Sequence, residues 1–201
     1  MKKQISDASR IAVLDAAWEL IAERGQLDVG QSEIAAQAGV SRQTIFLAFG
    51  SRAGLLVAML RNKDGQSHHV ARMTEIASRS GSESSDFLSF IDVWLDYLPV
   101  IYPVGIQLDV AALHDKDAAA AWDDRMKKAL LYGMKHILAR LQAAGRIAAG
   151  WTADTAAEMS WSLVHPASWR LLVVECGWSA EEFRRTRIEI ISQTLLRNSQ
   201  S

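Results

Sequence analysis

The sequence predicts an all-α protein, and three observations lead to that prediction. Apolar residues recur at the 3.6-residue period of a helix, first at Ile11, Leu14, Trp18 and Ile21. Capping residues and helix-ending glycines divide this pattern into separate helices. Strand signals are almost absent, because the only β-prone run, Leu171 to Val174, lies inside a helical pattern.

Four helices are predicted in the first third of the chain, and each has a start or stop signal. The first helix begins after Ser6, Asp7 or Ser9 and ends at Gly25. Two short helices follow over Gln31–Ala38 and Arg42–Phe49, and a longer helix begins at Ser51 or Arg52. Gly65 is a candidate break in the fourth helix.

The remaining elements are divided by polar runs and prolines. The run from Ser78 to Asp86 is predicted to be a loop, and the next helix stops before Pro99, with a second break at Pro103 and Gly105. The last three helices are predicted over Ala118–Ala144 with Gly145 at its end, over Thr152–Val174 with a kink at Pro166, and from the capping box of Ser179 and Glu182 to about Arg197.

Composition is typical of a globular protein and excludes several other classes. Of the 201 residues 49% are apolar, and 22 Lys plus Arg against 23 Asp plus Glu leave a net charge of −1, which by itself indicates no nucleic-acid partner. Cys176 is the only cysteine, which excludes an intrachain disulfide and a cysteine-based zinc site. No apolar signal core or uninterrupted run of about 18 apolar residues is found, so we expect a cytoplasmic protein.

The short helices over Gln31–Ala38 and Arg42–Phe49 are joined by a tight turn containing a glycine, which is the helix-turn-helix arrangement. Gly39 can adopt the left-handed conformation that the turn requires, and Ser41 can cap the second helix. Ile45 and Phe49 lie four residues apart and share the inner face of that helix.

The opposite face of the second helix carries side chains that suit base recognition. Arg42 can bridge guanine O6 and N7, Gln43 can pair with adenine, and Thr44 can contact a base or a thymine methyl. From Ile34 through Lys63 the chain contains no Asp or Glu, although its average composition predicts about three. A surface that binds phosphates must avoid carboxylates, because like charges repel. The alternative that these residues leave open is a pair of packed helices at the edge of a bundle.

Between about residues 10 and 60 the sequence resembles the N-terminal domain of the TetR family (tetracycline-repressor-like) of transcriptional regulators. The matching segments are Leu14–Ala17, Leu20–Ile21, Glu23–Gly25, Ile34–Ala35, Ala38–Ser41, Thr44–Phe46, Phe49 and Ser51–Leu55. The resemblance implies a DNA-binding domain over residues 1–65, with the motif at about 30–49, and a helical ligand-binding and dimerisation domain over 66–201.

The resemblance further implies that Gly30–Ala38 is the support helix, that Arg42–Phe49 is the recognition helix, and that Arg52 contacts a phosphate. The family's Thr-rich entry to the support helix is replaced here by Val29-Gly30-Gln31, and a frequent tyrosine is replaced by Phe46, which predicts fewer backbone contacts. The predicted DNA-binding residues are Gln31, Ser32, Ser41, Arg42, Gln43, Thr44, Phe46, Leu47 and Arg52.

Dimerisation and ligand binding are predicted in the other two thirds of the chain. The last two helices supply a four-helix dimer interface in the family, and its predicted residues are Trp161, Leu163, Leu171, Leu172, Ile188, Ile191 and Leu195. The predicted ligand-binding residues are Trp94, Tyr97, Leu98, Tyr102, Trp122, Met126, Trp161, His165 and Trp169. The open alternative for both sets is that the side chains form the core of the protomer.

Other chemistry has little support. His68, His69 and His114 lack the spacing of a metal site, and no catalytic or nucleotide-binding motif is present, so we expect no enzyme, no metal and no cofactor. The predicted function is a ligand-responsive regulator, a repressor, that binds double-stranded operator DNA as a homodimer and is released by a small apolar or aromatic effector. The alternatives are a helical ligand-binding or interaction protein without sequence-specific DNA binding and, third, a small helical enzyme.

Overall fold

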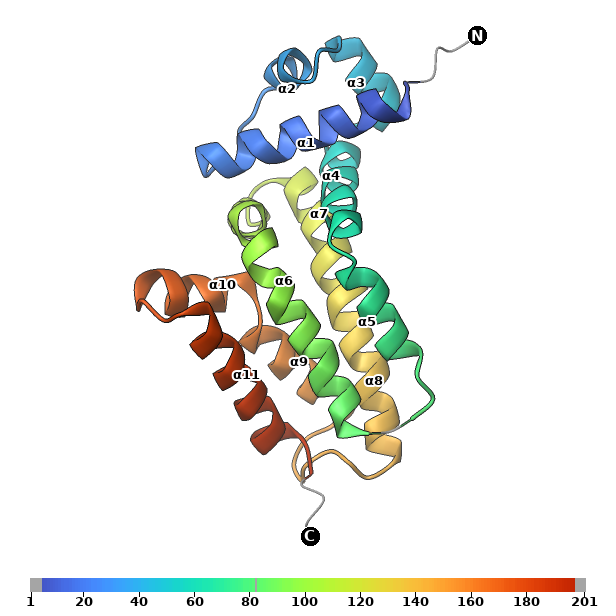
Figure 1. Cartoon of the computed structure of the whole chain (residues 1–201), viewed down its shortest axis with the longest axis vertical. Helices are drawn as coiled ribbons and strands as arrows, with labels where there is room; N and C mark the ends of the chain where they lie inside the picture. Colours follow the sequence, from blue (N-terminus) through green and yellow to red (C-terminus); the bar gives the residue numbers. More distant parts are fainter. Residues whose placement is uncertain (1–4, 82, 198–201) are drawn as a thin grey trace. The chain divides into compact units, whose positions relative to one another are not determined.

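The computed structural model describes residues 5–81 and 83–197, and within them it confirms the all-α prediction (Figure 1). The elements are α1 (Asp7–Arg24), α2 (Gln31–Gln37), α3 (Arg42–Phe49), α4 (Arg52–Gln66), α5 (His69–Ser78), α6 (Ser84–Ala111), α7 (Lys116–Arg125), the π-helical η1 (Met126–Leu131), α8 (Tyr132–Ala143), α9 (Ala153–Leu163), α10 (Pro166–Trp169), the π-helical η2 (Arg170–Glu175) and α11 (Ala180–Leu195). Position 82 of the predicted loop lies outside the described residues.

The chain forms two compact units. The first contains residues 1–66 and 101–125, and the second contains residues 67–100 and 126–201. The predicted boundary at residue 65 lies one residue before the end of α4, but residues 101–125 join the first unit, in which α7 packs along α4. The assignment of a separate role to each side of residue 65 stays a prediction.

Helices α1 to α4 form the small core of the first unit. Ser6 caps α1 by accepting a 3.2 Å hydrogen bond from the Ser9 amide, and Gly25 ends that helix with a φ of 62°. The core between the helices is made of apolar side chains that are at most 5% exposed: Leu14, Ile21, Ile34, Ile45, Leu56 and Met59. Their burial holds α2 and α3 against α1 and α4.

The prediction that a helix stops before Pro99 is wrong. Helix α6 runs for 28 residues through Pro99 and Pro103. Each proline removes one backbone hydrogen bond and crowds the preceding turn, at a cost of about 3 kcal/mol or more, whereas each of several buried large apolar side chains contributes about 1.5–3 kcal/mol. The stripe that spans both prolines, at most 2% exposed, is Leu95, Leu98, Ile101, Val104 and Leu108. Burial therefore outweighs the local cost of the prolines.

Helix α6 is also long and apolar enough to cross a membrane by length and composition alone. However, 56% of its most apolar window is buried inside the protein, which is the pattern of a core helix.

The later elements follow their predicted signals with two refinements. The helix predicted to end at Gly145 includes the π-helical segment η1, and Gly145 has a φ of 68°. At Pro166 the structure has a break instead of a kink, because Pro166 begins α10 and His165 caps it, with Nδ1 accepting from the Ala167 amide at 3.2 Å. Ser179 and Glu182 form the predicted capping box of α11.

Candidate nucleic-acid interface

The turn between α2 and α3 has the geometry that its residues predict. Gly39 has a φ of 66°, in the region that side chains with a Cβ disfavour. Ser41 caps α3, since its Oγ accepts from the Thr44 amide at 3.1 Å and lies 2.8 Å from the Thr44 hydroxyl. Thr44 is half-buried and is therefore partly engaged in this cap instead of being wholly available to a base.

The inner face of α3 is anchored by one buried residue and by a contact from α1. Ile45 is 1% exposed and packs in the core with Ile34. The Arg10 guanidinium lies 4.5 Å from the centre of the Phe49 ring and donates to the Ala48 carbonyl at 3.1 Å. These contacts orient the opposite face of α3 toward solvent. Sequence analysis did not identify Arg10, because its partners lie 38 positions away.

The outer face of α3 contains four of the predicted readers. Arg42 and Gln43 are exposed and form no hydrogen bond or ion pair with another described residue. Phe46 and Leu47 are each 61% exposed, which is unusual for large apolar side chains. The face therefore offers a guanidinium, an amide and two apolar groups with no carboxylate among them.

The entry to α2 contains a charge pair that the sequence did not reveal. Glu33 accepts from the Gly30 amide at 3.2 Å and binds Arg24, with 2.5 Å between Nη2 and Oε1. The hydrogen bond from Arg24 is the main cause of a lowered pKa of Glu33. The predicted phosphate contacts nearby are Ser32, which is exposed, and Gln31, which is half-buried.

Arg52 forms an ion pair that its predicted role as a phosphate contact does not require. Its Nη1 lies 2.5 Å from Asp115 Oδ2, and its Nη2 is 3.4 Å from the Leu27 carbonyl. Asp115 also caps α7 by accepting from the amides of Asp117 and Ala118. The hydrogen bond from Arg52 is the largest cause of a lowered pKa of Asp115. A phosphate contact by Arg52 would require this ion pair to open.

The predicted ligand-binding residues are distributed over both units. Tyr102 and Trp122 belong to the first unit, where Trp122 donates to Asp109 at 2.9 Å. The other seven belong to the second unit, where Trp94 is fully buried and donates to the Val164 carbonyl at 3.0 Å. Trp94, Leu98 and Met126 are at most 1% exposed, as the core alternative describes.

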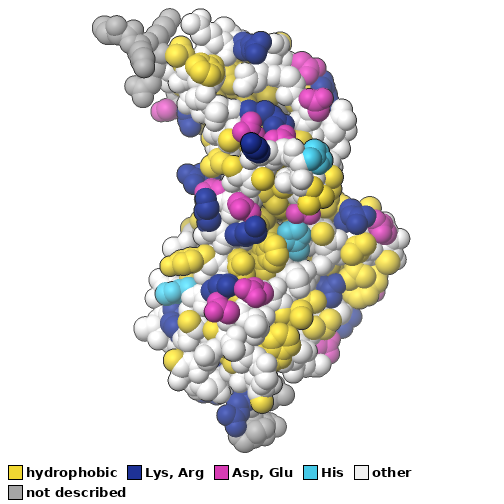
Figure 2. All heavy atoms as spheres, turned by 180° about the vertical axis from the view of Figure 1, so that it is seen from behind, with side chains coloured by type: hydrophobic (Ala, Val, Ile, Leu, Met, Phe, Trp, Pro, Cys, Tyr) yellow, Lys and Arg dark blue, Asp and Glu magenta, His cyan; other side chains and the backbone are white. Residues whose placement is uncertain are grey.

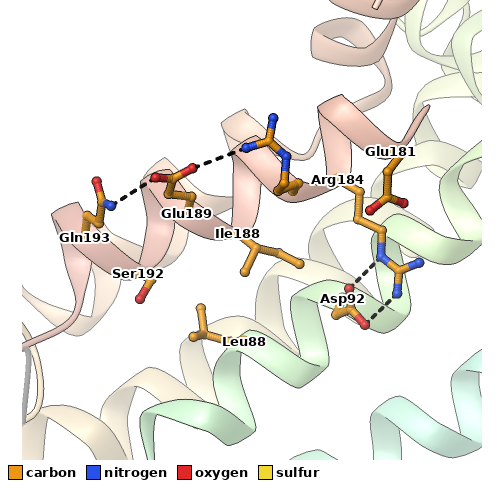
Figure 3. Close-up of a pocket in the computed structure, with 9 residues that line it drawn as sticks. Leu88, Asp92, Glu181, Arg184, Ile188, Glu189, Ser192 and Gln193 are labelled. Carbon is orange, nitrogen blue, oxygen red and sulfur yellow. Dashed lines mark hydrogen bonds and ion pairs between the residues drawn. The ribbon is translucent and has the colours of Figure 1, made fainter. Parts of the chain in front are cut away.

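The second unit has a surface groove of about 710 Å³ between α6 and α11 (Figure 3). Arg184 holds Asp92 with two hydrogen bonds of 2.6 and 2.7 Å across one end, while Leu88 and Ile188 lie on the two sides of the groove. None of the predicted ligand-binding residues lines it. Its rim carries charges of both signs, Asp92, Glu181 and Glu189 against Arg184 and Arg185.

The predicted dimer surface is corrected at two positions. Ile191 and Leu195 are fully buried inside the second unit, because they share the inner face of α11 with Phe183. Leu171 is 47% exposed, and the structure adds two exposed apolar residues that sequence analysis missed, Met159 at 40% and Val174 at 59%. The other predicted residues, Trp161, Leu163, Leu172 and Ile188, are half-buried. Hydrophobic side chains gather over the flank that carries α9, α10 and η2 (Figure 2).

Comparison with known proteins agrees with this architecture. Residues 13–59 match the model of the bacterial regulatory proteins of the TetR family. Over 63 residues the chain is 41% identical to the fatty acid metabolism regulator protein of Bacillus subtilis (strain 168), a match that spans about a third (31%) of each protein.

Solved structures match over almost the whole chain, at identities that show the fold alone. FadR of Bacillus subtilis in complex with stearoyl-CoA has a TM-score of 0.69 and 21% identity, covering 90% of this chain and 96% of that one. NalD of Pseudomonas aeruginosa, the secondary repressor of a multidrug efflux pump, has a TM-score of 0.70 and 17% identity, covering 96% and 100%.

A regulator from Saccharomonospora viridis in complex with choline has a TM-score of 0.73 and 20% identity, covering 96% of this chain and 100% of that one. All three of these proteins are transcriptional regulators or repressors. Residues 13–59 of this chain thus match the DNA-binding domain model of the TetR family of bacterial regulatory proteins, and the chain as a whole shares its fold with solved transcriptional regulators.

Proposed function

We propose that this protein is a cytoplasmic transcriptional repressor that binds operator DNA as a homodimer and releases it when a small apolar or aromatic effector binds. The observation that carries the proposal is the outer face of α3, where Arg42, Gln43, Phe46 and Leu47 are all exposed and no carboxylate lies among them. In this proposal residues 1–65 bind DNA, and residues 66–201 bind the effector and form the dimer.

The dimensions and chemistry of α3 support insertion into the major groove. Its eight residues form a rod about 12 Å long, which is close to the width of that groove. Arg42 and Gln43 are free to form bidentate bonds with guanine and adenine, because no described residue engages them. Ser32, which is exposed at the start of α2, would contact a phosphate.

Dimerisation is supported by the exposed apolar residues of the second unit. Met159, Leu171 and Val174 lie on α9 and η2, the elements that precede α11, and a second copy would remove them from water. A two-fold dimer would present two recognition helices about 34–36 Å apart, one turn of B-DNA. Linking two recognition helices, each of which binds DNA weakly alone, raises the effective concentration of the second helix at its half-site once the first has bound.

An effector is supported by two of the structural relatives, which were solved with stearoyl-CoA and with choline. The second unit of this chain is rich in buried aromatic side chains, among them Trp94, Trp169 and Phe183, which suit an apolar ligand. A ligand that binds one arrangement of the dimer more tightly would shift the spacing of the recognition helices and so release DNA.

The proposal is tested by charge reversal on the outer face of α3. DNA enriched from a random pool by the purified chain would be titrated with the wild type, with Arg42→Glu and with the control Lys128→Glu. Lys128 is an exposed residue of η1 in the second unit, and its replacement makes the same change in charge. We expect Arg42→Glu to abolish binding without changing dimer mass, and Lys128→Glu to bind like the wild type. Equal binding by the wild type and Arg42→Glu would reject the proposed interface and favour an interaction protein.

A further inference from the structure

The inner face of α11 contains one charged residue in an apolar stripe. Phe183, Arg187, Ile191 and Leu195 follow each other at intervals of four residues, and all except Arg187 are fully buried apolar side chains. Arg187 itself is 8% exposed. Its guanidinium lies 4.8 Å from the centre of the Phe183 ring, and that ring packs edge-on against Trp169 at 5.1 Å. A permanent positive charge is therefore placed among aromatic rings inside the second unit.

This guanidinium has no anionic partner among the described residues. Its Nε is buried without a hydrogen-bond acceptor, and no described carboxylate forms an ion pair with the side chain. Arg184, three positions earlier on the same helix, instead holds Asp92 with two hydrogen bonds (Figure 3). Burial lowers the pKa of Arg187, and no neighbouring carboxylate opposes that shift.

A buried arginine without a partner is unfavourable for the free protein. Arginine stays protonated near neutral pH, so burial cannot be relieved by loss of the proton as it can for lysine. The Phe183 ring compensates the lost hydration only in part, because a ring face attracts a cation less strongly than a carboxylate does. A buried group of this kind is stabilised when an anion with two acceptor oxygens binds its planar fork.

We infer that Arg187 is the anion-recognition residue of the effector site, and that the effector is an amphipathic anion with an apolar body and a carboxylate or phosphate head. The inference rests on the proposed function, since it names the chemical class of the effector. Its apolar body would lie against the aromatic side chains of the same cluster, Phe183 and Trp169, and because these are only 0% and 6% exposed they would have to move apart to admit it. This inward environment favours a small ligand over a partner subunit, because a subunit interface would engage the outer face of α11.

Ligand binding would be measured with three probes of equal chain length. Dodecanoate and dodecyl phosphate carry the two anionic heads, and dodecanol is the neutral control. We expect at least one anion to bind the wild type about tenfold more tightly than dodecanol and to raise its Tm. The tighter of the two anions identifies the head group. In Arg187→Met, which keeps the length of the side chain without its charge, the preference for the anion should disappear.

The stability of the free protein provides a second readout. Because Arg187 has no partner to lose, Arg187→Met should raise the Tm of the unliganded protein by about 2–5 °C. The matched variant Arg184→Met breaks an ion pair on the same helix and should not raise the Tm or change the preference for an anion. A merely structural role of Arg187 predicts the opposite sign, a lower Tm for Arg187→Met.

Three results would overturn the inference: no anion binds better than dodecanol, the preference persists in Arg187→Met, or the variant has a lower Tm. Dissociation of the Arg187→Met dimer in sedimentation analysis would also overturn it and would assign the residue to the subunit interface. Operator binding is measured separately on each variant. Failure of the wild type to bind DNA would reject the proposed function, whereas the anion preference is read without DNA.

Discussion

Arg52, at the first position of α4, and Asp115, which caps α7, form an ion pair of 2.5 Å between Nη1 and Oδ2. Both residues belong to the first unit, and they lie 63 positions apart in the sequence. The arginine expected to contact a phosphate is thus held by a carboxylate when DNA is absent. If Arg52 contacts a phosphate as predicted, phosphate and Asp115 would compete for one guanidinium, and the affinity for DNA would depend on the position of α7.

Replacing Asp115 with Asn should strengthen DNA binding. Asn keeps an oxygen that can cap α7 but removes the charge that holds Arg52, so the guanidinium becomes available to a phosphate. We expect the Kd for the operator to fall about threefold to tenfold at moderate salt, measured by fluorescence anisotropy. The control is Asp124→Asn, which removes the same charge from the pair with the exposed Arg61 and should leave the Kd unchanged. An unchanged or higher Kd for Asp115→Asn would show that Arg52 does not reach DNA.

The same ion pair predicts a dependence of stability on pH. The pKa of Asp115 is lowered in the folded protein, chiefly by the hydrogen bond from Arg52. The contribution of the pair to the free energy of unfolding is therefore present above the unfolded pKa, about 4, and is lost as the pH falls through the folded pKa. The Tm of the wild type should exceed that of Asp115→Asn at pH 6, and the difference should shrink below about pH 4. A difference that is constant from pH 7 to pH 3 would contradict this reading.

The exposed apolar residues of α3 predict recognition of thymine methyl groups. Phe46 and Leu47 are each 61% exposed in the free protein, and the major groove offers the C5 methyl of thymine as an apolar contact. Replacing a contacted thymine of the operator with deoxyuridine removes that methyl and should weaken binding about fourfold per methyl. Leu47→Ala should make the protein insensitive to at least one of these replacements. Equal affinity for the operator and its fully uracil-substituted form would exclude methyl recognition.

The apolar flank over α9 and η2 predicts a variant that separates the dimer. Val174 is 59% exposed, and Val174→Asp would place a charge on the proposed dimer surface. We expect sedimentation analysis to show monomers at micromolar concentration, together with loss of operator binding. Leu113→Asp is the matched control, because Leu113 is 86% exposed in the first unit and should not affect the mass. A Val174→Asp protein of unchanged mass would place the interface elsewhere.

The sequence predicted best those features that depend on neighbouring residues. The bounds of α3, the cap at Ser41 and the turn at Gly39 all follow from signals within about ten positions, and the structure has each of them. The course of α6 through Pro99 did not follow, because burial of its apolar stripe outweighs a local signal.

For the candidate nucleic-acid interface, the sequence predicted only those side chains whose exposure to solvent follows from helical spacing. That Arg42 and Gln43 face solvent could be read from the position of Ile45, but the pairing of Arg52 with Asp115 joins distant segments and has no local signal. For α11 the apolar period was visible, yet it does not tell whether Ile191 packs inside the protomer or against a second copy. The charged residue within that period, Arg187, was visible in the sequence, but its lack of a partner was not.

The most direct test of the central claim is the pattern of bases that the purified chain enriches from random double-stranded DNA. Two recognition helices related by two-fold symmetry predict two inverted half-sites whose centres lie about 10 base pairs apart, or a multiple of that distance, with binding that weakens steeply as salt is raised. A pool without an enriched sequence, or a single half-site bound by a monomer, would contradict the account.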